Sequence, residues 1–233
     1  MKHLSLIIPA YNEEQRIRST VLNYEKNLSE KFKNYEIIVV LNGCRDDSLK
    51  VIKELQQKIP KLKFLNYEEP IGKGGAIIEG MRYAEGAIVG FVDADDAFSI
   101  QGVIRLIEDV ENGTDCVIAS KWKNQRFRDV TEPNLRKALS RGWNGLVRNL
   151  LGLNYEDTQA GAKFCNKKVL ESIGYEFISR DFTFDAEFLH KIKQKRFKIK
   201  EVFVPSKHIK GSTFKIKHSI PMFMNLMKVW WSK

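Results

Sequence analysis

Short apolar runs alternate, along the first half of the chain, with longer segments in which apolar residues recur every three or four positions. The short runs have the length of buried strands, and the longer segments have the period of amphipathic helices. This alternation predicts a parallel sheet with right-handed helical crossovers. The predicted strands are Leu4–Pro9, Glu36–Leu41, Lys63–Leu65, Ile88–Val92 and Cys116–Ala119. The predicted helices are Glu13–Leu28, Asp47–Lys58, Gly74–Ala84 and Ile100–Glu111.

The second half of the chain is less regular. Its pattern predicts a long helix, a strand, a second helix and a last strand at Glu132–Leu151, Ala162–Cys165, Phe182–Lys195 and Ile199–Val204. No repeat or linker divides the chain, so we expect one domain over residues 1–213. Residues 214–233 form an amphipathic basic segment, with Pro221 early in a predicted helix and Trp230 and Trp231 near its end. We expect this segment either to lie on a membrane surface or to pack on the sheet.

The positive charge is concentrated at the C-terminal end. The formal net charge is +10, and residues 188–233 hold 12 Lys or Arg against one acid, Glu201. Such a region favours a membrane surface, a nucleic acid or a phosphorylated substrate, although a solvated Lys-rich surface has the same composition. Because no helix-turn-helix, zinc-finger or RNA-binding signature accompanies it, we expect no nucleic-acid partner.

The cysteines and the apolar runs bear on the compartment. Cys44, Cys116 and Cys165 are widely spaced and show neither metal-ligand spacing nor a disulfide framework, which favours a reducing compartment. The first apolar run is too short for a signal-peptide core, and no run approaches the roughly 18 apolar residues of a membrane span. We therefore expect a cytoplasmic protein.

Three carboxylates within four residues follow the apolar run that ends at Val92, at Asp93, Asp95 and Asp96. The carboxyl edge of an open α/β sheet is where ligands bind, and crowded carboxylates repel one another unless a cation separates them. Hard oxygen ligands suit Mg²⁺ or Mn²⁺, which proteins often share with substrate phosphates. The alternative is a solvated turn that opens the next helix, with Ser99 as its N-cap.

Three further loops are predicted at the same edge. Tyr11 and Glu13 follow the first strand and suit stacking on a base and accepting from a ribose or base, although the segment also suits a helix start. Asn42 offers a donor and an acceptor to a nucleobase, but Asn-Gly is also a common turn. Glycines and Lys73 precede a helix at residues 72–75, where backbone and charge favour an anion.

The ordered set of motifs resembles the family 2 glycosyltransferases of the GT-A fold, and within them the dolichyl-phosphate glucosyltransferase and mannose synthase group. The motifs span about nine-tenths of the chain. They are Pro9-Ala10-Tyr11-Asn12-Glu13, Gly72-Lys73-Gly74-Gly75-Ala76, Asp93-Ala94-Asp95, Asp157-Thr158-Gln159-Ala160-Gly161, Phe184-Asp185-Ala186-Glu187-Phe188-Leu189 and His208-Ile209-Lys210-Gly211-Ser212.

The resemblance implies a GT-A fold, a nucleotide-diphospho-sugar donor and a role for each motif. Asp93 and Asp95 would bind Mg²⁺ or Mn²⁺ on the diphosphate, and Asp157 and Asp185 would lie near the sugar and acceptor. The other residues implied at the nucleotide sugar are Pro9, Ala10, Tyr11, Glu13, Asn42, Gly43, Lys73, Gly74, Ala94, His208 and Ser212. Two segments depart from the family pattern. Leu41-Asn42-Gly43-Cys44 stands where the family usually has paired aspartates and Gly-Ser, and Ala160-Gly161 stands where it has Cys-Gly.

The leading hypothesis is a metal-dependent inverting transfer of a hexose to a polyprenyl phosphate. UDP-glucose is the first donor candidate and GDP-mannose the second. Arg136 and Arg141 suit the acceptor phosphate because guanidinium binds phosphate bidentately, although a solvated helix face also carries arginines. An anionic acceptor needs no strong base, whereas a hydroxyl acceptor needs a carboxylate, for which Asp157 and then Asp185 are candidates.

Other hypotheses stay open at this point. In one of them, the acceptor is a hydroxyl of a glycan, glycolipid or small molecule. In another, the chain is an inactive regulator that binds a sugar nucleotide. A basic nucleic-acid-binding module is the alternative of another class. With a lipid acceptor, we expect a peripheral protein at the cytoplasmic membrane face, with or without a membrane-protein partner.

Overall fold

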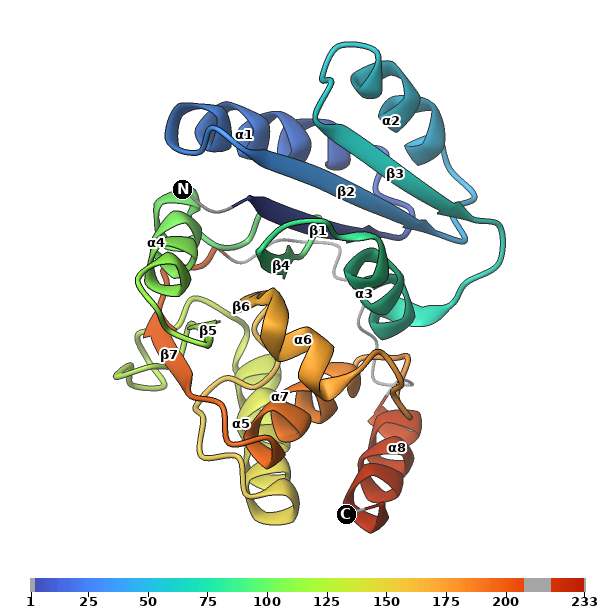
Figure 1. The fold of residues 1–233 in the computed structure, drawn as a ribbon. Coiled ribbons are helices and arrows are strands. Elements are labelled where there is room, and N and C mark those ends of the chain that lie inside the picture. The colour runs from blue at the N-terminus through green and yellow to red at the C-terminus, as the bar shows by residue number, and fades with distance from the viewer. Residues whose placement is uncertain (1–2, 208–218, 233) are drawn as a thin grey trace.

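The computed structural model describes residues 3–207 and 219–232, which include a seven-stranded sheet in the order β3-β2-β1-β4-β6-β5-β7 (Figure 1). Its strands are β1 Leu4–Ala10, β2 Tyr35–Asn42, β3 Leu62–Tyr67, β4 Ile88–Val92, β5 Cys116–Ser120, β6 Ala162–Asn166 and β7 Ile199–Phe203. Only β6 runs antiparallel to its neighbours among the paired strands of the described chain. The predicted α/β fold with a mostly parallel sheet is confirmed.

Helices cover both faces of the sheet. They are α1 Ile17–Lys31, α2 Ser48–Gln56, α3 Gly72–Tyr83, α4 Ile100–Glu111, α5 Asn134–Leu151, α6 Lys167–Ile173, α7 Phe184–Gln194 and α8 Ser219–Trp231. The apolar sides of α1, α2 and α4 share one core with the sheet, and α3, α5, α6, α7 and α8 share the core on its other face (Figure 1). Burial of alternate strand residues into each core holds the strand register.

Four helix starts lie later than the sequence pattern predicted, and two of them have a visible backbone cause. The first predicted helix started at Glu13, but α1 begins at Ile17, because Asn12 adopts a positive φ of 54° and the chain turns before the helix. The long predicted helix started at Glu132, but α5 begins at Asn134, directly after Pro133 in an extended conformation. Ser99 caps α4, which the sequence analysis gave as part of the alternative to a metal site, since its hydroxyl accepts from the Gly102 amide at 3.3 Å. The short helix α6 was not predicted.

The expectation of no disulfide is wrong, because Cys116 and Cys165 are joined. They lie 49 residues apart in the chain but face each other across the antiparallel β5–β6 pair. The sequence analysis did not predict this contact, because the apolar pattern of β6 does not show in which direction the strand runs. Of the three cysteines, Cys44 stays free.

The last helix, α8, has one buried apolar face and one exposed face. Met222, Leu226 and Val229 are buried, and Leu226 and Val229 belong to the core that α7 shares. The opposite face exposes Ile220, and Trp231 is 82% exposed at the end of the helix. Packing against the body of the protein therefore accounts for one face of α8 and leaves the other exposed. None of the helices in the described part of the chain combines the length and the apolar content needed to cross a bilayer.

Candidate active site

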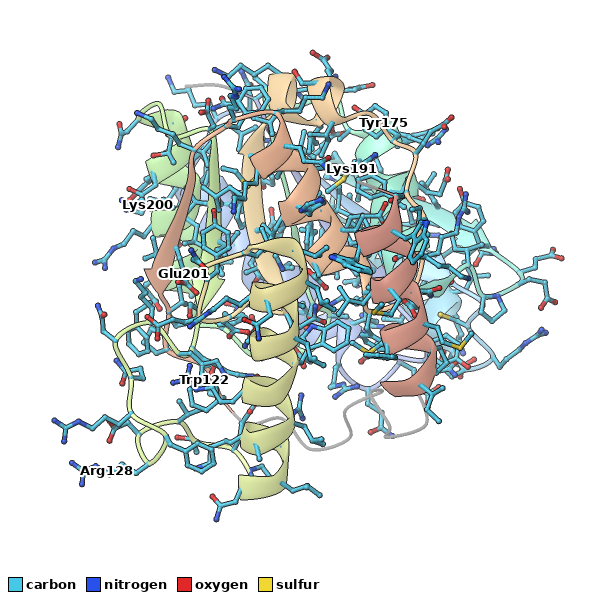
Figure 2. All side chains as sticks on the ribbon, turned by 90° about the horizontal axis from the view of Figure 1, so that it is seen from below. Trp122, Arg128, Tyr175, Lys191, Lys200 and Glu201 are labelled. Atoms are coloured by element: carbon cyan, nitrogen blue, oxygen red, sulfur yellow. A yellow bond between two sulfur atoms is a disulfide. The ribbon has the colours of Figure 1, made fainter. Side chains whose placement is uncertain are left out.

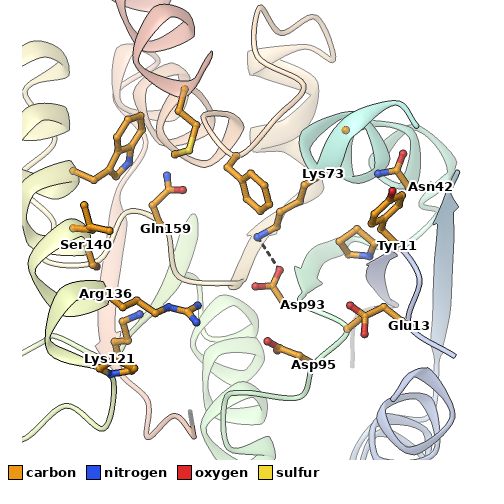
Figure 3. Close-up of a pocket in the computed structure, with 18 of the residues that line it drawn as sticks. Tyr11, Glu13, Asn42, Lys73, Asp93, Asp95, Lys121, Arg136, Ser140 and Gln159 are labelled. Carbon is orange, nitrogen blue, oxygen red and sulfur yellow. Dashed lines mark ion pairs between the residues drawn. The ribbon is translucent and has the colours of Figure 1, made fainter. Parts of the chain in front are cut away.

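A pocket of about 1190 Å³ opens at the carboxyl ends of β1, β2 and β4 (Figure 3). Its wall continues past the start of α3 to α5 and α8. The parallel strands bring four of the predicted motifs to this edge, as the sequence predicted. Of the residues predicted at the nucleotide sugar, the described chain places Pro9, Ala10, Tyr11, Glu13, Asn42, Lys73, Asp93 and Ala94 in the wall.

The two glycines predicted beside the nucleotide, Gly43 and Gly74, pack closely against other segments of the fold. Gly43 adopts φ +69° and packs on Pro70, where a side chain would collide with the proline. Gly74 packs on Phe184 of α7, and neither glycine is in the pocket wall. The next amide, of Gly75, donates to the Arg180 carbonyl at 3.1 Å, so this helix start is used within the protein.

The residues predicted at the nucleoside lie at the end of the pocket that β1 and β2 form. The amide oxygen of Asn42 accepts from the Ile71 backbone at 2.7 Å, which ties β2 to the loop before α3. Glu13 bonds to Arg16 at 2.7 Å, and burial raises the pKa of its carboxyl despite this contact. Tyr11 is partly exposed beside them, so its ring is accessible for stacking.

Asp93 and Asp95 point into the same part of the pocket (Figure 3). Burial, and then the neighbouring charge of Asp93, raises the pKa of Asp95. Lys73 pairs with Asp93 at 2.8 Å and lies 3.7 Å from Asp185. Burial would lower the pKa of Lys73, but Asp93 and Asp185 outweigh it and raise that pKa. The site is therefore a cluster of carboxylates with one lysine between them.

This cluster fits a divalent cation that a substrate helps to bind. Mg²⁺ is commonly held by one or two carboxylates together with substrate phosphates. Asp93 and Asp95 supply two carboxylates, and their mutual repulsion is what a cation relieves. Among the described residues, no group of three or more His, Cys, Asp or Glu is arranged to hold a metal by itself. The remaining ligands would then come from a diphosphate.

Gly161 holds space for the carboxylate of Asp93. The Asp93 amide donates to the Gly161 carbonyl at 2.9 Å, and a Cβ on Gly161 would overlap the Asp93 carboxyl group. We expect Gly161→Ala to displace that carboxylate and weaken Mn²⁺ binding by about tenfold, as loss of a well-placed ligand contact does. Titration of Mn²⁺ in the presence of nucleoside diphosphate measures this. Gly145→Ala, where the added Cβ meets nothing within 4 Å and the residue does not line the pocket, is the control and should bind as the wild type does.

Two cations line the opposite end of the pocket. Arg136 of α5 points into the pocket toward the aspartates, with Lys121 beside it (Figure 3). Lys121 was missed by the sequence analysis, although it follows the end of β5, the position that identified Asp93 after β4. Arg141, predicted beside Arg136, lies instead over the Trp122 ring at 4.6 Å and is absent from the described pocket wall.

Asp157 and Asp185 lie behind the pocket wall rather than in it. Asp157 is buried and accepts from the Lys121 backbone at 3.2 Å, and burial raises the pKa of its carboxyl. Glu201 of β7 accepts from the amide of Asp157 at 2.8 Å and holds this loop in place. Asp185 is 1% exposed and pairs with Lys163 of β6. His208 and Ser212, predicted to close over the diphosphate, lie outside the described residues.

The chain belongs to glycosyl transferase family 2, whose family model matches residues 5–174. It is therefore a glycosyltransferase. Dolichyl-phosphate beta-glucosyltransferase ALG5A of Trichomonas vaginalis is 32% identical over 97% of this chain and 72% of its own length. Glycosyltransferase AglD of Haloferax volcanii is 27% identical over 98% of this chain, which spans 37% of that protein.

Solved structures show the same fold. Glucosyl-3-phosphoglycerate synthase from Mycobacterium tuberculosis, in complex with phosphoglyceric acid, matches with a TM-score of 0.71 at 19% identity. The match covers 99% of this chain and 79% of that one. The predicted GT-A architecture is thereby confirmed, and at this identity the likeness concerns the fold.

Proposed function

We propose that this glycosyltransferase moves a hexose from a nucleotide-diphospho-sugar to a polyprenyl or dolichyl phosphate. The observation that carries the proposal is one continuous pocket with a carboxylate end and a cationic end, the latter formed by Lys121 and Arg136. UDP-glucose is the proposed donor, with GDP-mannose as the second candidate. The similar dolichyl-phosphate beta-glucosyltransferases support the acceptor and the sugar. A complex of the Mycobacterium tuberculosis synthase with Mn²⁺, UDP-glucose and phosphoglyceric acid supports the metal and a phosphate-bearing acceptor.

An apolar wall beside the cationic end suits a lipid chain. Leu135, Leu139 and Leu146 of α5 and Phe223 of α8 all line the pocket, and all four are substantially exposed. Figure 2 shows α5 and α8 running side by side. Exposed leucines in a groove lose water contact when an isoprenoid chain covers them, which stabilises the complex by about 25 cal/mol per Å² of apolar area.

The proposed reaction is a direct displacement at the anomeric carbon, which inverts its configuration. The acceptor phosphate is already an anion, so no side chain has to take a proton from it. Arg136 and Lys121 would orient that phosphate, and Lys73 would offset negative charge on the leaving diphosphate. A cation on Asp93 and Asp95 would supply further charge stabilisation when bound. The buried positions of Asp157 and Asp185 favour this route over a hydroxyl acceptor.

We also propose that the exposed apolar side of α8 lies on a membrane surface. Ile220, Met224 and Trp231 are exposed there, and Lys228 is on the same helix. Apolar and aromatic side chains with interspersed lysine suit the interface of an anionic bilayer. A membrane-protein partner is the alternative occupant, and binding of the protein to anionic vesicles without any partner distinguishes the two.

The test is nucleoside diphosphate release from UDP- and GDP-sugars, with and without a short polyprenyl phosphate. We expect release that depends on the lipid phosphate. Arg136→Ala removes charge-assisted contacts to that phosphate, and we expect KM for the lipid to rise about 10- to 100-fold. The KM for the donor should change less than twofold.

Arg141→Ala is the matched control, because it removes the same charge from the same helix but from outside the pocket wall. We expect its KM for the lipid to stay within threefold of the wild type. Equal effects of the two substitutions would contradict the assignment of the phosphate to Arg136. Release that is indifferent to the lipid phosphate would contradict the proposed acceptor.

A further inference from the structure

Glu132 contacts both cations at the acceptor end of the pocket. One oxygen, Oε1, lies 2.9 Å from Lys121 Nζ and 3.6 Å from Arg136 Nε. The glutamate immediately precedes Pro133 and α5, so it is attached to the start of the helix that carries Arg136. Its side chain is largely buried. The two cations proposed for the acceptor phosphate are therefore already paired with a carboxylate of the protein.

The other oxygen of this carboxylate lacks a hydrogen-bond partner in the described part of the chain. This oxygen, Glu132 Oε2, is buried. A buried acceptor without a partner costs free energy, so the contact with the two cations is not a fully satisfied ion pair. A phosphate has more acceptor oxygens and more charge than a carboxylate, which suits it to displace Glu132 from Lys121 and Arg136.

We propose that Glu132 is an intramolecular competitor for the acceptor-phosphate site. This inference rests on the proposed lipid-phosphate acceptor. Before the reaction the acceptor is a phosphate monoester with a charge of about −1.5 to −2, which attracts the two cations more strongly than one carboxylate does. After the sugar is attached, the phosphate is a diester with a single negative charge. The Glu132 carboxylate then carries the same charge as the product phosphate. It pairs again with Lys121 and Arg136 and so promotes release of the product.

If Glu132 competes with the acceptor phosphate, removing its charge should tighten the binding of that phosphate. Geranyl phosphate serves as the acceptor probe, and its methyl diester serves as a monoanionic product probe. Calorimetric titration of the full chain without donor should give a Kd for Glu132→Gln about five- to tenfold lower than the wild-type Kd for both probes. Product inhibition by the diester should increase by the same factor. Glu54→Gln removes an equal charge from an exposed ion pair with Arg18 and should leave both Kd values within twofold.

The outcomes separate the inference from the proposal on which it rests. An unchanged or higher Kd for Glu132→Gln, with the wild type binding geranyl phosphate, would show that Glu132 only anchors the start of α5. If neither protein binds geranyl phosphate more tightly than geraniol, the lipid-phosphate acceptor itself is overturned. If Glu132→Gln does not fold, Glu132→Asp keeps the charge but shortens the reach to the cations. The Kd of Glu132→Asp for geranyl phosphate should be two- to threefold lower than the wild-type Kd. A Kd that is not lower would overturn the inference.

Discussion

Asp95→Asn is expected to lower sugar transfer by about 10³-fold, which corresponds to roughly 4 kcal/mol of transition-state stabilisation. Asp95 lines the pocket beside Asp93, and the amide that replaces its carboxylate carries no charge for a divalent cation. Burial, and to a lesser extent the charge of Asp93, raises the pKa of Asp95. Nucleoside diphosphate release at saturating donor and lipid phosphate measures the loss.

Asp96→Asn is the matched control for this substitution. Asp96 is the next residue and has a φ of 52°, a conformation that asparagine tolerates. Its side chain accepts from Asn23 at 2.9 Å and is absent from the described pocket wall. We expect Asp96→Asn to retain at least a third of the wild-type rate. Mn²⁺ binding in the presence of nucleoside diphosphate should fail for Asp95→Asn alone, and normal binding and turnover in that variant would contradict the assignment.

Asp185→Asn is expected to destabilise the protein by about 3–5 kcal/mol, the usual cost of removing one partner from a buried ion pair. The Lys163 side chain is fully buried and pairs with Asp185, so the substitution leaves an ammonium in the core without its counter-charge. Lys163 also donates to the Ala160 carbonyl at 2.6 Å, which does not supply a charge. For a chain of this size the loss lowers Tm by roughly 6–20 °C. Thermal and urea unfolding both measure it.

The double variant Lys163→Met with Asp185→Asn separates charge from packing. It removes both charges together, and we expect it to recover most of the lost stability. Asp109→Asn removes a carboxylate from an ion pair in which the Lys200 side chain is 52% exposed and the Asp109 side chain 21%, and it should cost less than about 1 kcal/mol. If the double variant is no more stable than Asp185→Asn, the loss does not come from the uncompensated ammonium of Lys163.

The apolar pattern predicted the strands well and the helix starts less well. Runs such as Ile88–Val92 are buried on both faces of the sheet, so their sequence is apolar throughout and their limits are sharp. The start of α1 depends on the positive φ of Asn12 and on its contact with the Arg45 amide at 2.7 Å, 33 residues away. A local pattern contains no information on that contact.

The sequence predicted site residues that come directly after a strand. It did not predict residues whose position depends on contacts between distant segments. Asp93 and Lys121 each follow a strand that ends at the same edge, so the rule that identified Asp93 would also have identified Lys121. Arg141 was distinguishable from Arg136 only once Trp122 was seen beneath its guanidinium. Gly74 has a loop-like sequence context, but the approach of Phe184 from α7 explains why it is glycine.

The sequence by itself determined the α/β class, the strand positions and the edge that holds Asp93 and Asp95, because buried parallel strands are apolar and ligands bind at their carboxyl ends. Only the tertiary structure decided the antiparallel direction of β6, the pairing of Cys116 with Cys165, and the meeting of Glu132 with both pocket cations. It also decided that Asp185 is buried against Lys163. These features depend on contacts between segments far apart in the chain, whose geometry is determined by packing of the whole domain rather than by any local pattern.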